Sequence, residues 1–362
     1  MPGVGTPDQV VREDLSDLYI NLDVQKTVFL TRLKRGEQLK NVSLFSWALE
    51  KYDGRLTTGI PEGADVDTFE SDKQVKLSGR SQKFWRRPHV TVEANDVNVA
   101  PAEFGKYRKQ VVKKTVEQKR DIELRLLSDS DSRDDDGING REFMGAGRFF
   151  NDGVSVGVAG AALTWGDAQT SVLANTPDYV MPTAQIYTGY LYSQDVSGNQ
   201  TLVFDDEALL NMMQNRWDLL GATSEFSGFV DGVLKRHLSR LSRYQKNMVG
   251  FTPTSRTMQE AISAKNYLMF GADLLETDFG PVDINLVSWM PRTSGNAMSG
   301  RGYFFDMEFM YLRPSGLWLT HKELEDKGGG PRGLIQSILG PQWGDPRGAL
   351  KVDPATVVGV LT

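Results

Sequence analysis

The sequence contains no cysteine and only three histidines, and this scarcity removes most of the side chains used as metal ligands or nucleophiles. Disulfide bonds and thiolate metal sites are therefore excluded. His89, His237 and His321 lie far apart in the chain, and none belongs to a pair with metal-ligand spacing such as HxxxH. These absences argue against most catalysis, so we predict no enzymatic activity and assign no catalytic, cofactor-binding or metal-binding residue.

Long hydrophobic runs and an excess of positive charge are also missing. No window of about eighteen apolar residues occurs, and the first residues lack the basic and apolar regions of a signal peptide. The net charge is −6, so the chain does not have the basic excess of a dedicated nucleic-acid binder. A chain of 362 residues is long enough for two domains. We expect a two-domain protein that is made in the cytosol and used there, or in something assembled there.

The strongest positive signal is a long helix, predicted for residues 101–127. Pro101 suits a first helical turn because its missing N–H would be unpaired there, and polar residues with glycine follow Leu127. Such a helix is about 40 Å long, more than a compact core requires, which suggests a strut. Lysines and arginines cover most of its surface. The narrow apolar stripe consists of Phe104, Tyr107, Val111, Thr115, Ile122 and Leu126.

The residues before this helix predict an arm and a hairpin. Residues 1–10 are typical of an extended arm, and residues 14–21 of a short amphipathic helix. A strand, a turn and a second strand are predicted within residues 27–47. Residues 48–87 predict a long, largely polar, two-stranded hairpin, followed by a regular strand at 89–93. Because an isolated hairpin is marginal in water, this one needs a partner surface.

The residues after the long helix mix helices and strands. Residues 154–163 are small and apolar, which indicates a tightly packed core segment. Helices are predicted at 206–220, 230–241 and 258–268, and strands at 268–276, 281–289, 298–312, 334–339 and 349–352. No regular βαβ order appears, and this favours an α+β fold over a doubly wound sheet.

Two short motifs resemble catalytic signatures. Asp278, Phe279 and Gly280 spell the kinase magnesium motif, but no glycine-rich loop, VAIK lysine or HRD loop accompanies them, so a turn between strands is predicted. The stretch 328–333 fits GxGxxG but lacks a preceding strand, and Pro331 is incompatible with the helix that would hold phosphate. A flexible loop is predicted there.

An acidic stretch follows the long helix. If Gly137 takes position six of an EF-hand loop, Asp134 and Asp136 take positions three and five, but Ser132 and Phe143 stand where two further ligands are needed. Asp129, Asp131 and Asp135 add to the charge. Two interpretations remain open: a loose divalent-cation site in 129–142, or a solvated turn that caps the strut.

The order of these parts resembles the major capsid proteins of tailed bacteriophages, which have the HK97-like fold. The order is an extended arm, an unsupported hairpin, a strut helix and an α+β region that ends in strands. Short stretches of sequence similar to this family occur over roughly 27–352. These stretches are TVFLTRLKRGEQLKNVSLFSW, KKTVEQKRDIELRLLS, YLMFGADLLETDFGPVDINLVSWMP, GYFFDMEFMYLRP and KGGGPRGLIQSILG. The acidic insertion at 129–140 and the segment 164–200 depart from the resemblance and are read as surface decoration.

The resemblance implies a division of the chain. The expected parts are an N-terminal arm with the first strands (1–47), an extended loop across a neighbouring subunit (48–100), a peripheral domain (101–164) with the spine helix 101–127, an axial domain (165–327) at five- and sixfold axes, and a return to the peripheral domain (328–362). A hairpin that is unstable alone becomes ordered when it pairs with another copy.

The implied function is that of a major capsid protein, which self-assembles into an icosahedral shell around double-stranded DNA in the virion. Expected partners are other copies as pentamers and hexamers, separate scaffolding and portal proteins, decoration proteins, and DNA contacted sparsely through phosphate. Assembly is expected in the host cytoplasm. Two alternatives stay open: an encapsulin-like compartment, and a calcium-dependent binding or hydrolytic protein that uses the acidic loop.

Overall fold

The computed structural model describes most of the chain but leaves gaps. The described residues are 27–40, 43–50, 59, 62–63, 65, 74–93, 106–154, 180–194, 200–221, 226–239, 274–288, 290, 300–316, 318–325, 329–354 and 358–360. The predicted arm 1–10, the helices 14–21 and 258–268, and all but the first residue of the segment 154–163 lie outside the described residues. Within the described part, no helix combines the length and apolarity needed to cross a membrane.

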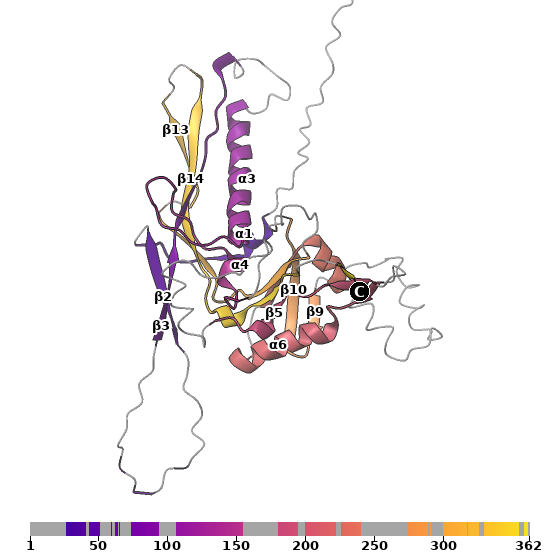
Figure 1. Cartoon of the computed structure of the whole chain (residues 1–362). Helices are drawn as coiled ribbons and strands as arrows, with labels where there is room; N and C mark the ends of the chain where they lie inside the picture. Colours follow the sequence, from indigo (N-terminus) through magenta and orange to yellow (C-terminus); the bar gives the residue numbers. More distant parts are fainter. Residues whose placement is uncertain are drawn as a thin grey trace, which may run out of the picture.

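A five-stranded sheet covered by a long helix forms one half of the molecule (Figure 1). Its strands are β1 (Lys34–Arg35), β4 (Gln82–Arg86), β12 (Tyr311–Pro314), β13 (Thr320–Leu324) and β14 (Arg332–Gln342). The long strand β14 pairs antiparallel with β4 along one edge and with β13 and β12 along the other, and β1 extends the sheet parallel to β12. The prediction of strand at 334–339 is confirmed.

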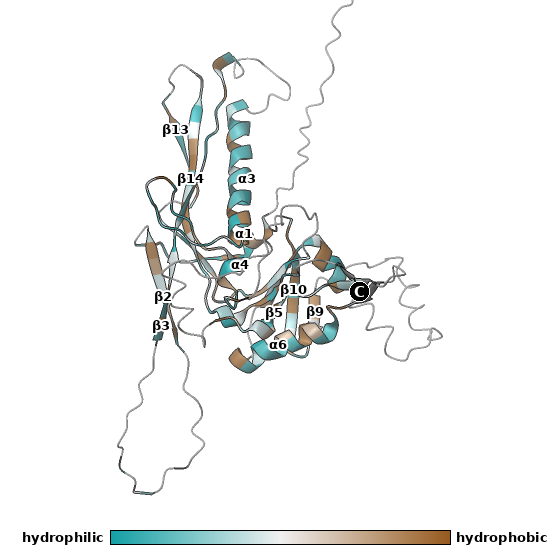
Figure 2. Cartoon of the chain, in the orientation of Figure 1, coloured by the Kyte–Doolittle hydropathy of each residue, from teal (hydrophilic) through white to brown (hydrophobic). Residues whose placement is uncertain are grey.

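The helix α3 (Lys106–Leu126) is the predicted strut, and residues 101–105 lie outside the described part. Figure 2 shows that it is hydrophilic over most of its length. Ile122 and Leu126 are buried, as the apolar stripe predicts. Gln118 is buried as well, and its side-chain amide donates to the Phe84 carbonyl at 3.2 Å and to the Ser337 hydroxyl at 2.8 Å. These two bonds fix α3 to β4 and β14.

A six-stranded sheet with the helix α6 (Asp206–Leu220) forms the other half. The strands, in spatial order, are β5 (Ile186–Tyr187), β15 (Leu350–Val352), β11 (Gly302–Asp306), β8 (Phe226–Val230), β10 (Gly280–Leu286) and β9 (Leu274–Thr277). Asp205 caps α6 by accepting from the backbone N–H of Ala208, and Gly221, with φ of 73°, follows its last residue. The predicted bounds of this helix are confirmed.

Both sheets share an aromatic core. Phe29, Phe150, Phe229, Phe305 and Trp343 are buried together, and the rings of Phe150 and Phe305 lie 4.9 Å apart. The Trp343 indole N–H donates to the carbonyl of Met144 at 3.1 Å, so its one polar atom is satisfied inside the core. A second cluster of buried residues, which includes Leu209 and Phe304, lies beneath α6. The first cluster connects the two halves of the molecule.

The predicted hairpin is present. Strands β2 (Leu44–Glu50) and β3 (Gln74–Arg80) pair antiparallel over seven residues, and this two-stranded ribbon lies beside the main body (Figure 1). It begins a few residues earlier than predicted and ends at Arg80, because residues 82–86 leave it as β4. Phe45 anchors the ribbon over Gly340, where an added Cβ would lie 2.6 Å from the Phe45 ring.

Three predictions of local structure are wrong. Residues 28–32 form the short helix α1 (Val28–Arg32) instead of a strand. Residues 89–93 contain one isolated bridge, from His89 to Arg332, and a helical pair at 92–93. The single alternating strand predicted at 298–312 is two strands, β11 and β12. All five residues of β11 are buried, since both faces of the sheet are covered there.

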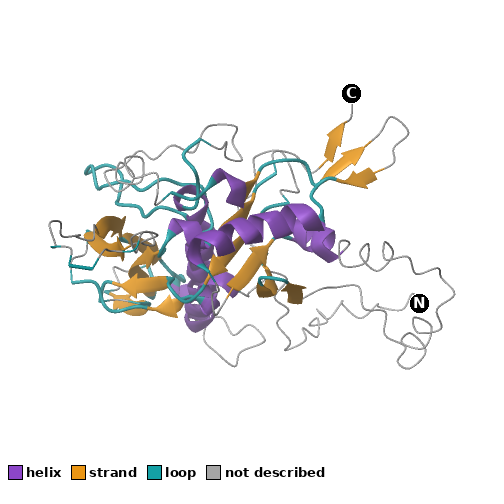
Figure 3. Cartoon of the chain, turned by 90° about the horizontal axis from the view of Figure 1, so that it is seen from below, coloured by secondary structure: helices purple, strands orange, loops and turns teal. Residues whose placement is uncertain are grey.

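The remaining predictions fit the structure with shifted bounds. Residues 232–239 are helical, within the helix predicted at 230–241, and β9, β10 and β15 lie within or beside their predicted strands. A small separate sheet stands near the C-terminus (Figure 3). It consists of β16 (Val358–Val360), β6 (Tyr192–Gln194) and β7 (Gln200–Leu202). Helices and strands mix along the chain, and antiparallel strand pairs outnumber parallel ones among the described strands, so the α+β class is confirmed.

Candidate functional site

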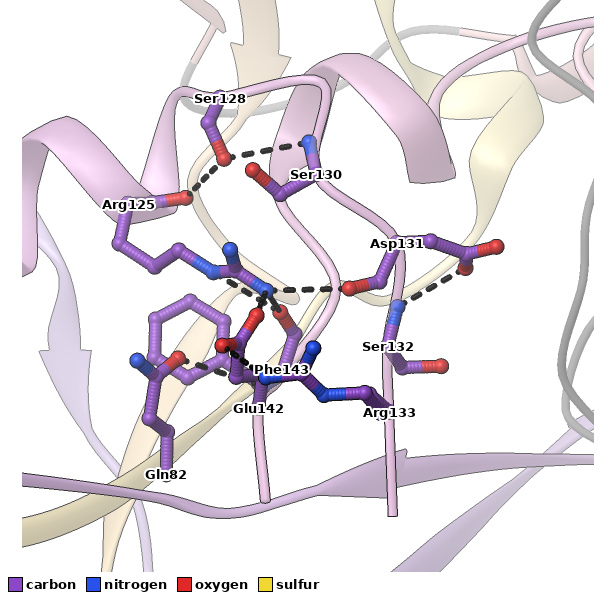
Figure 4. A network of polar contacts seen from close by, with 9 residues as sticks. All are labelled: Gln82, Arg125, Ser128, Ser130, Asp131, Ser132, Arg133, Glu142 and Phe143. Atoms are coloured by element: carbon purple, nitrogen blue, oxygen red, sulfur yellow. Dashed lines mark hydrogen bonds and ion pairs between the residues drawn. The ribbon is translucent and has the colours of Figure 1, made fainter. Parts of the chain in front are cut away.

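The acidic stretch after α3 is a folded turn held by one arginine (Figure 4). The Arg125 side chain reaches from the last turn of α3, and its Nη2 donates to the carbonyls of Asp131 at 3.0 Å and Phe143 at 2.8 Å. It also pairs with Glu142 at 2.9 Å, and Glu142 in turn pairs with Arg133 at 2.7 Å. Burial lowers the pKa of Arg125, while Glu142 opposes that shift. The turn is therefore closed by the protein's own cations.

The geometry does not assemble the EF-hand ligand set. Ser132 and Phe143, at the first and last positions of the hypothetical loop, are buried in the protein. Asp134 forms an ion pair of 2.8 Å with Arg80. Within the described residues, no group of three or more histidine, aspartate or glutamate side chains is arranged to hold a metal ion. The cation-site interpretation gains no support from this arrangement.

Asp136 serves the local backbone. Its carboxylate accepts the backbone N–H and the side-chain amide of Asn139 and the backbone N–H of Ile138, the pattern of an Asx turn. These hydrogen bonds, the one from the Asn139 N–H foremost, lower the pKa of Asp136 to about 2. The side chain is fully exposed and ionised, so this part of the stretch matches the solvated turn.

Asp129 points inward and joins a buried ionic junction between the two halves. Arg301, 1% exposed, contacts both Asp129 and Asp353, and its Nε donates to Asp353 Oδ1 at 2.9 Å. Lys351 donates to the carbonyl of Gly147 at 2.9 Å and lies 3.6 Å from Asp353. We call Asp129, Gly147, Arg301, Lys351 and Asp353 the junction; it joins the end of α3, the helix α4 (Ala146–Phe149) and strand β15.

The junction is balanced in charge, with two cations and two carboxylates. Burial alone would lower the pKa of Arg301, but the neighbouring acidic groups outweigh it, so that pKa is raised. Burial likewise opposes ionisation of Asp353, yet Arg301 and Lys351 hold its pKa below the usual range. Burial lowers the pKa of Lys351. Each charge thus depends on its partners, and removing one leaves the others uncompensated.

Tyr303 lies beside the junction on β11. It is fully buried, and its hydroxyl donates to the carbonyl of Leu127, the residue after α3, at 3.3 Å. Burial raises its pKa well above the usual value, so it stays a neutral donor. An added Cβ on Gly147 would lie 2.5 Å from this hydroxyl and 2.0 Å from Asp129 Oδ1, which shows how closely α4 approaches.

The two motifs that resemble catalytic signatures are structural. Asp278 and Phe279 form the turn between β9 and β10, and Gly280 has a φ of 118°. In the second motif, Gly330 has a φ of 101°, and an added Cβ would lie 2.3 Å from the Val90 carbonyl. β14 follows it at once, so no helix N-terminus faces a phosphate. The turn prediction at 278–280 is confirmed, whereas the last two residues of the predicted loop 328–333 belong to β14.

The three histidines are dispersed. The His89 ring contacts the Gly329 carbonyl at 3.0 Å, and the His321 ring contacts the Tyr107 hydroxyl at 3.1 Å. His237 is buried in the second core cluster, where its ring contacts the Phe204 carbonyl. His89 and His321 both lie beside β14, on opposite edges of that strand, whereas His237 belongs to the other half of the molecule.

Sequence reasoning missed the junction completely. Arg301, Lys351 and Asp353 carry no motif, and, apart from the pair of Lys351 with Asp353, their partners lie 52 to 204 positions away in the chain. In the sequence, Asp129 stands as one acid among several after the long helix. A charged residue inside an otherwise apolar strand pattern, such as Lys351 between Leu350 and Val352, is the one local signal that could have indicated it.

Comparison with known proteins is consistent with this architecture. The family model described as SU10 major capsid protein matches residues 3–347. No curated protein matches the sequence.

Solved structures match over nearly the whole chain at low identity. The capsid protein of cyanophage P-SCSP1u is 9% identical with a TM-score of 0.57, and the match covers 98% of this chain and 96% of that chain. The capsid of a native GTA particle is 13% identical with a TM-score of 0.54, and the match covers 96% of this chain and 96% of that chain. The cyanophage Pam1 capsid is 11% identical with a TM-score of 0.54, and the match covers 97% of this chain and 98% of that chain. The shared feature is the fold, which is HK97-like.

Proposed function

This chain belongs to the SU10 major capsid protein family, and from that premise we infer how its parts serve a shell. It is a major capsid protein: copies self-assemble into the icosahedral head that encloses the double-stranded DNA of a tailed bacteriophage. Its place is the virion capsid. Neither the compartment nor the calcium-dependent alternative gains support from the family match.

We assign the two halves of the molecule to the two domains of a capsid subunit. The five-stranded sheet with α3 is the peripheral domain, and the six-stranded sheet with α6 is the axial domain at the five- and sixfold axes. The boundary predicted at residue 328, between the axial domain and the return to the peripheral domain, does not separate these two sheets. β12 and β13 precede that residue yet pair with β14, whereas β15 follows it and pairs with β11.

The hairpin is the observation that carries this proposal. Its base is a regular ribbon whose last pair is Glu50 with Gln74, and residues 51–73 lie between them in the sequence. A ribbon of two strands is marginal in water by itself. We therefore assign the hairpin within the predicted 48–100 as the extended loop that lies across a neighbouring subunit, and leave 82–86 to the five-stranded sheet as β4. Residues 1–47 comprise an arm that also contacts a neighbour and, from α1 to the start of β2, residues that pack on the body of the subunit.

The remaining partners follow from the same reading. Pentamers and hexamers form the shell, a separate scaffolding protein guides assembly, and portal and decoration proteins join it in the host cytoplasm. The packaged DNA is contacted sparsely through phosphate charge. The protein has no enzymatic role. Its contribution is mechanical, since many weak contacts per subunit add up around closed rotation axes.

The test is assembly of a loop-shortened chain. Replacing residues 51–73 with Asn-Gly joins Glu50 to Gln74 through a two-residue turn that suits an antiparallel ribbon. Size-exclusion chromatography with light scattering and negative-stain imaging should find large shells for the full chain. The shortened chain should remain folded and soluble but form at most small oligomers. A full chain that stays a monomer under crowding and salt would contradict the proposal, as would normal shells from the shortened chain.

A further inference from the structure

One face of the five-stranded sheet is turned away from α3 and is partly open to solvent. On β4, Arg86 faces α3, where it pairs with Asp121, so the alternate residues Lys83 and Trp85 face away. On β14 the buried residues alternate with partly exposed ones. On β13, His321 contacts α3 through Tyr107, so its neighbours in the strand face away. We call this surface the outer sheet face.

The outer sheet face is basic and apolar. The charged residues at the outward positions of these strands are Lys83, Lys322 and Arg332, and the exposed Arg87 directly follows β4; no acidic residue occurs at the outward positions. Trp85 is 57% exposed. The Lys83 ammonium lies 5.3 Å and the Arg87 guanidinium 5.6 Å from the centre of the Trp85 ring. An exposed tryptophan between two cations indicates a contact surface for an acidic partner with apolar side chains.

The hairpin supplies a segment of complementary composition. Residues 59–72 contain five acids and no basic residue, together with Ile60, Val66 and Phe69. The acids are Glu62, Asp65, Asp67, Glu70 and Asp72. A segment of this kind matches the cations by charge and the exposed tryptophan by apolar contact.

Chain geometry favours a contact between copies. β3 runs into β4 through Ser81 alone, so the open end of the ribbon, at Gln74, is nine residues of extended chain from Lys83, or about 30 Å. Each arm of 51–73 can span about 36–40 Å when fully extended. To reach its own outer sheet face, the segment would have to reverse and use most of that length. The segment does not have to reverse in order to reach the outer sheet face of a neighbouring copy.

We propose that residues 59–72 of one copy dock on the outer sheet face of a second copy, with Lys83, Arg87, Lys322 and Arg332 around Trp85 as the receiving surface. This inference rests on the proposed function, because it needs an assembled shell. It assigns the receiving residues and makes charge pairing their means of recognition. The contact should weaken with rising salt, because its ion pairs are near the surface.

Zero-length cross-linking of assembled particles tests the contact directly. Particles built from equal amounts of ¹⁴N- and ¹⁵N-labelled subunits are treated with a carbodiimide, which joins a carboxylate to an amine in contact. We expect Lys83 or Lys322 joined to the acids of 59–72, with about half of the joined pairs carrying mixed isotopes. Links confined to single copies, links to the lysines of α3 instead, or well-formed particles without links would overturn the proposal.

A charge exchange gives a second test. Lys83→Glu with Arg87→Glu should reduce particle yield at least about tenfold, since like charges across an interface cost several kcal/mol. Asp65→Lys with Asp67→Lys should do the same, and the four substitutions together should restore the yield. The matched control, Arg108→Glu with Lys113→Glu, changes exposed positions of α3 and should leave the yield and the cross-links unchanged.

The outcomes of these two experiments distinguish a failure of the docking contact from a failure of the capsid function. If the full chain forms no particles, both the proposed function and this contact are contradicted. If the full chain forms particles but the fourfold variant, shown to be folded by its thermal midpoint, fails to recover, the docking contact alone is wrong.

Discussion

The backbone N–H of Leu30 donates a hydrogen bond of 3.2 Å to the carboxylate of Glu123, although the two residues are 93 positions apart. Glu123 is fully buried on α3 beneath the first turn of α1. Burial raises its pKa to about 7, and hydrogen bonds from the backbone of Leu30, Phe29 and Val28 only partly offset that shift. A buried acid therefore holds α1 against α3 and keeps its proton over the acidic range.

This raised pKa predicts that Glu123→Gln makes the subunit more stable than wild type at alkaline pH. Between pH 4.5 and about 7 the folded state keeps the proton that the unfolded state releases. The stabilisation of the folded state by protonated Glu123 is therefore fully present below pH 4.5, and it is lost as the pH rises through about 7. Glutamine does not titrate. Relative to wild type, the free energy of unfolding of the variant should therefore rise by roughly 3 kcal/mol at most between pH 5 and pH 8.

The measurement is urea unfolding of unassembled subunits at both pH values. Glu325→Gln, at an exposed position after β13, is the matched control and should show no such gain. Equal effects of Glu123→Gln at pH 5 and pH 8 would contradict the assignment.

Arg301 should be the most sensitive residue of the junction. Arg301→Met leaves the buried Asp353 and the half-buried Asp129 without their shared cation, which should lower the free energy of unfolding by about 3–5 kcal/mol. Arg301→Met with Asp353→Leu retains one carboxylate and Lys351, so the charges balance again and much of the loss should be recovered. Chemical unfolding of the two variants measures the difference. A double variant as unstable as the single one would show that packing, not charge, governs this region.

Gly147 should not tolerate a side chain. An added Cβ would lie 2.0 Å from Asp129 Oδ1, so Gly147→Ala should shift the junction and destabilise the subunit by about 1–3 kcal/mol. Alanine would otherwise favour a helix by about 1 kcal/mol. Gly232, also in a helix, has no atom within 4 Å of an added Cβ, and Gly232→Ala should be neutral or stabilising. Thermal unfolding of both variants compares them, and equal effects would refute the steric account.

The elements that sequence could predict are those governed by local residues. α6 has an acidic cap at Asp205 and a glycine at 221, and both act within one turn. The turn at Asp278 and Phe279 depends on Gly280, whose positive φ a glycine alone accepts easily. The stripe that ends in Leu126 predicted α3 because its spacing is helical. In each case the residues that determine the element are next to it in the chain.

The elements that sequence could not predict depend on distant partners. The run from Val28 to Arg32 begins with three apolar residues and includes the β-branched Val28 and Thr31, which favours a strand. A carboxylate 93 positions away nevertheless accepts its backbone N–H groups and stabilises a helix. The residues predicted as one strand at 298–312 pair in two different sheets, β11 with β8 and β15, and β12 with β14, and these partners are distant in the chain. The junction is invisible locally for the same reason, because its members meet only after the two sheets pack.

The acidic turn yields the last prediction, that calcium leaves this protein unchanged. Asp134 pairs with Arg80, and Asp136 already accepts backbone and side-chain N–H groups, so neither carboxylate is arranged for a cation. Millimolar calcium should shift neither the thermal midpoint nor the particle yield of chelator-treated protein. Asp134→Asn with Asp136→Asn should also leave assembly intact, since exposed ion pairs contribute at most about 1 kcal/mol. A calcium-dependent rise in the midpoint that disappears in this double variant would instead establish a cation site in the turn. Because the double variant keeps the size of both side chains, such a result would report the lost charge and not a change in packing.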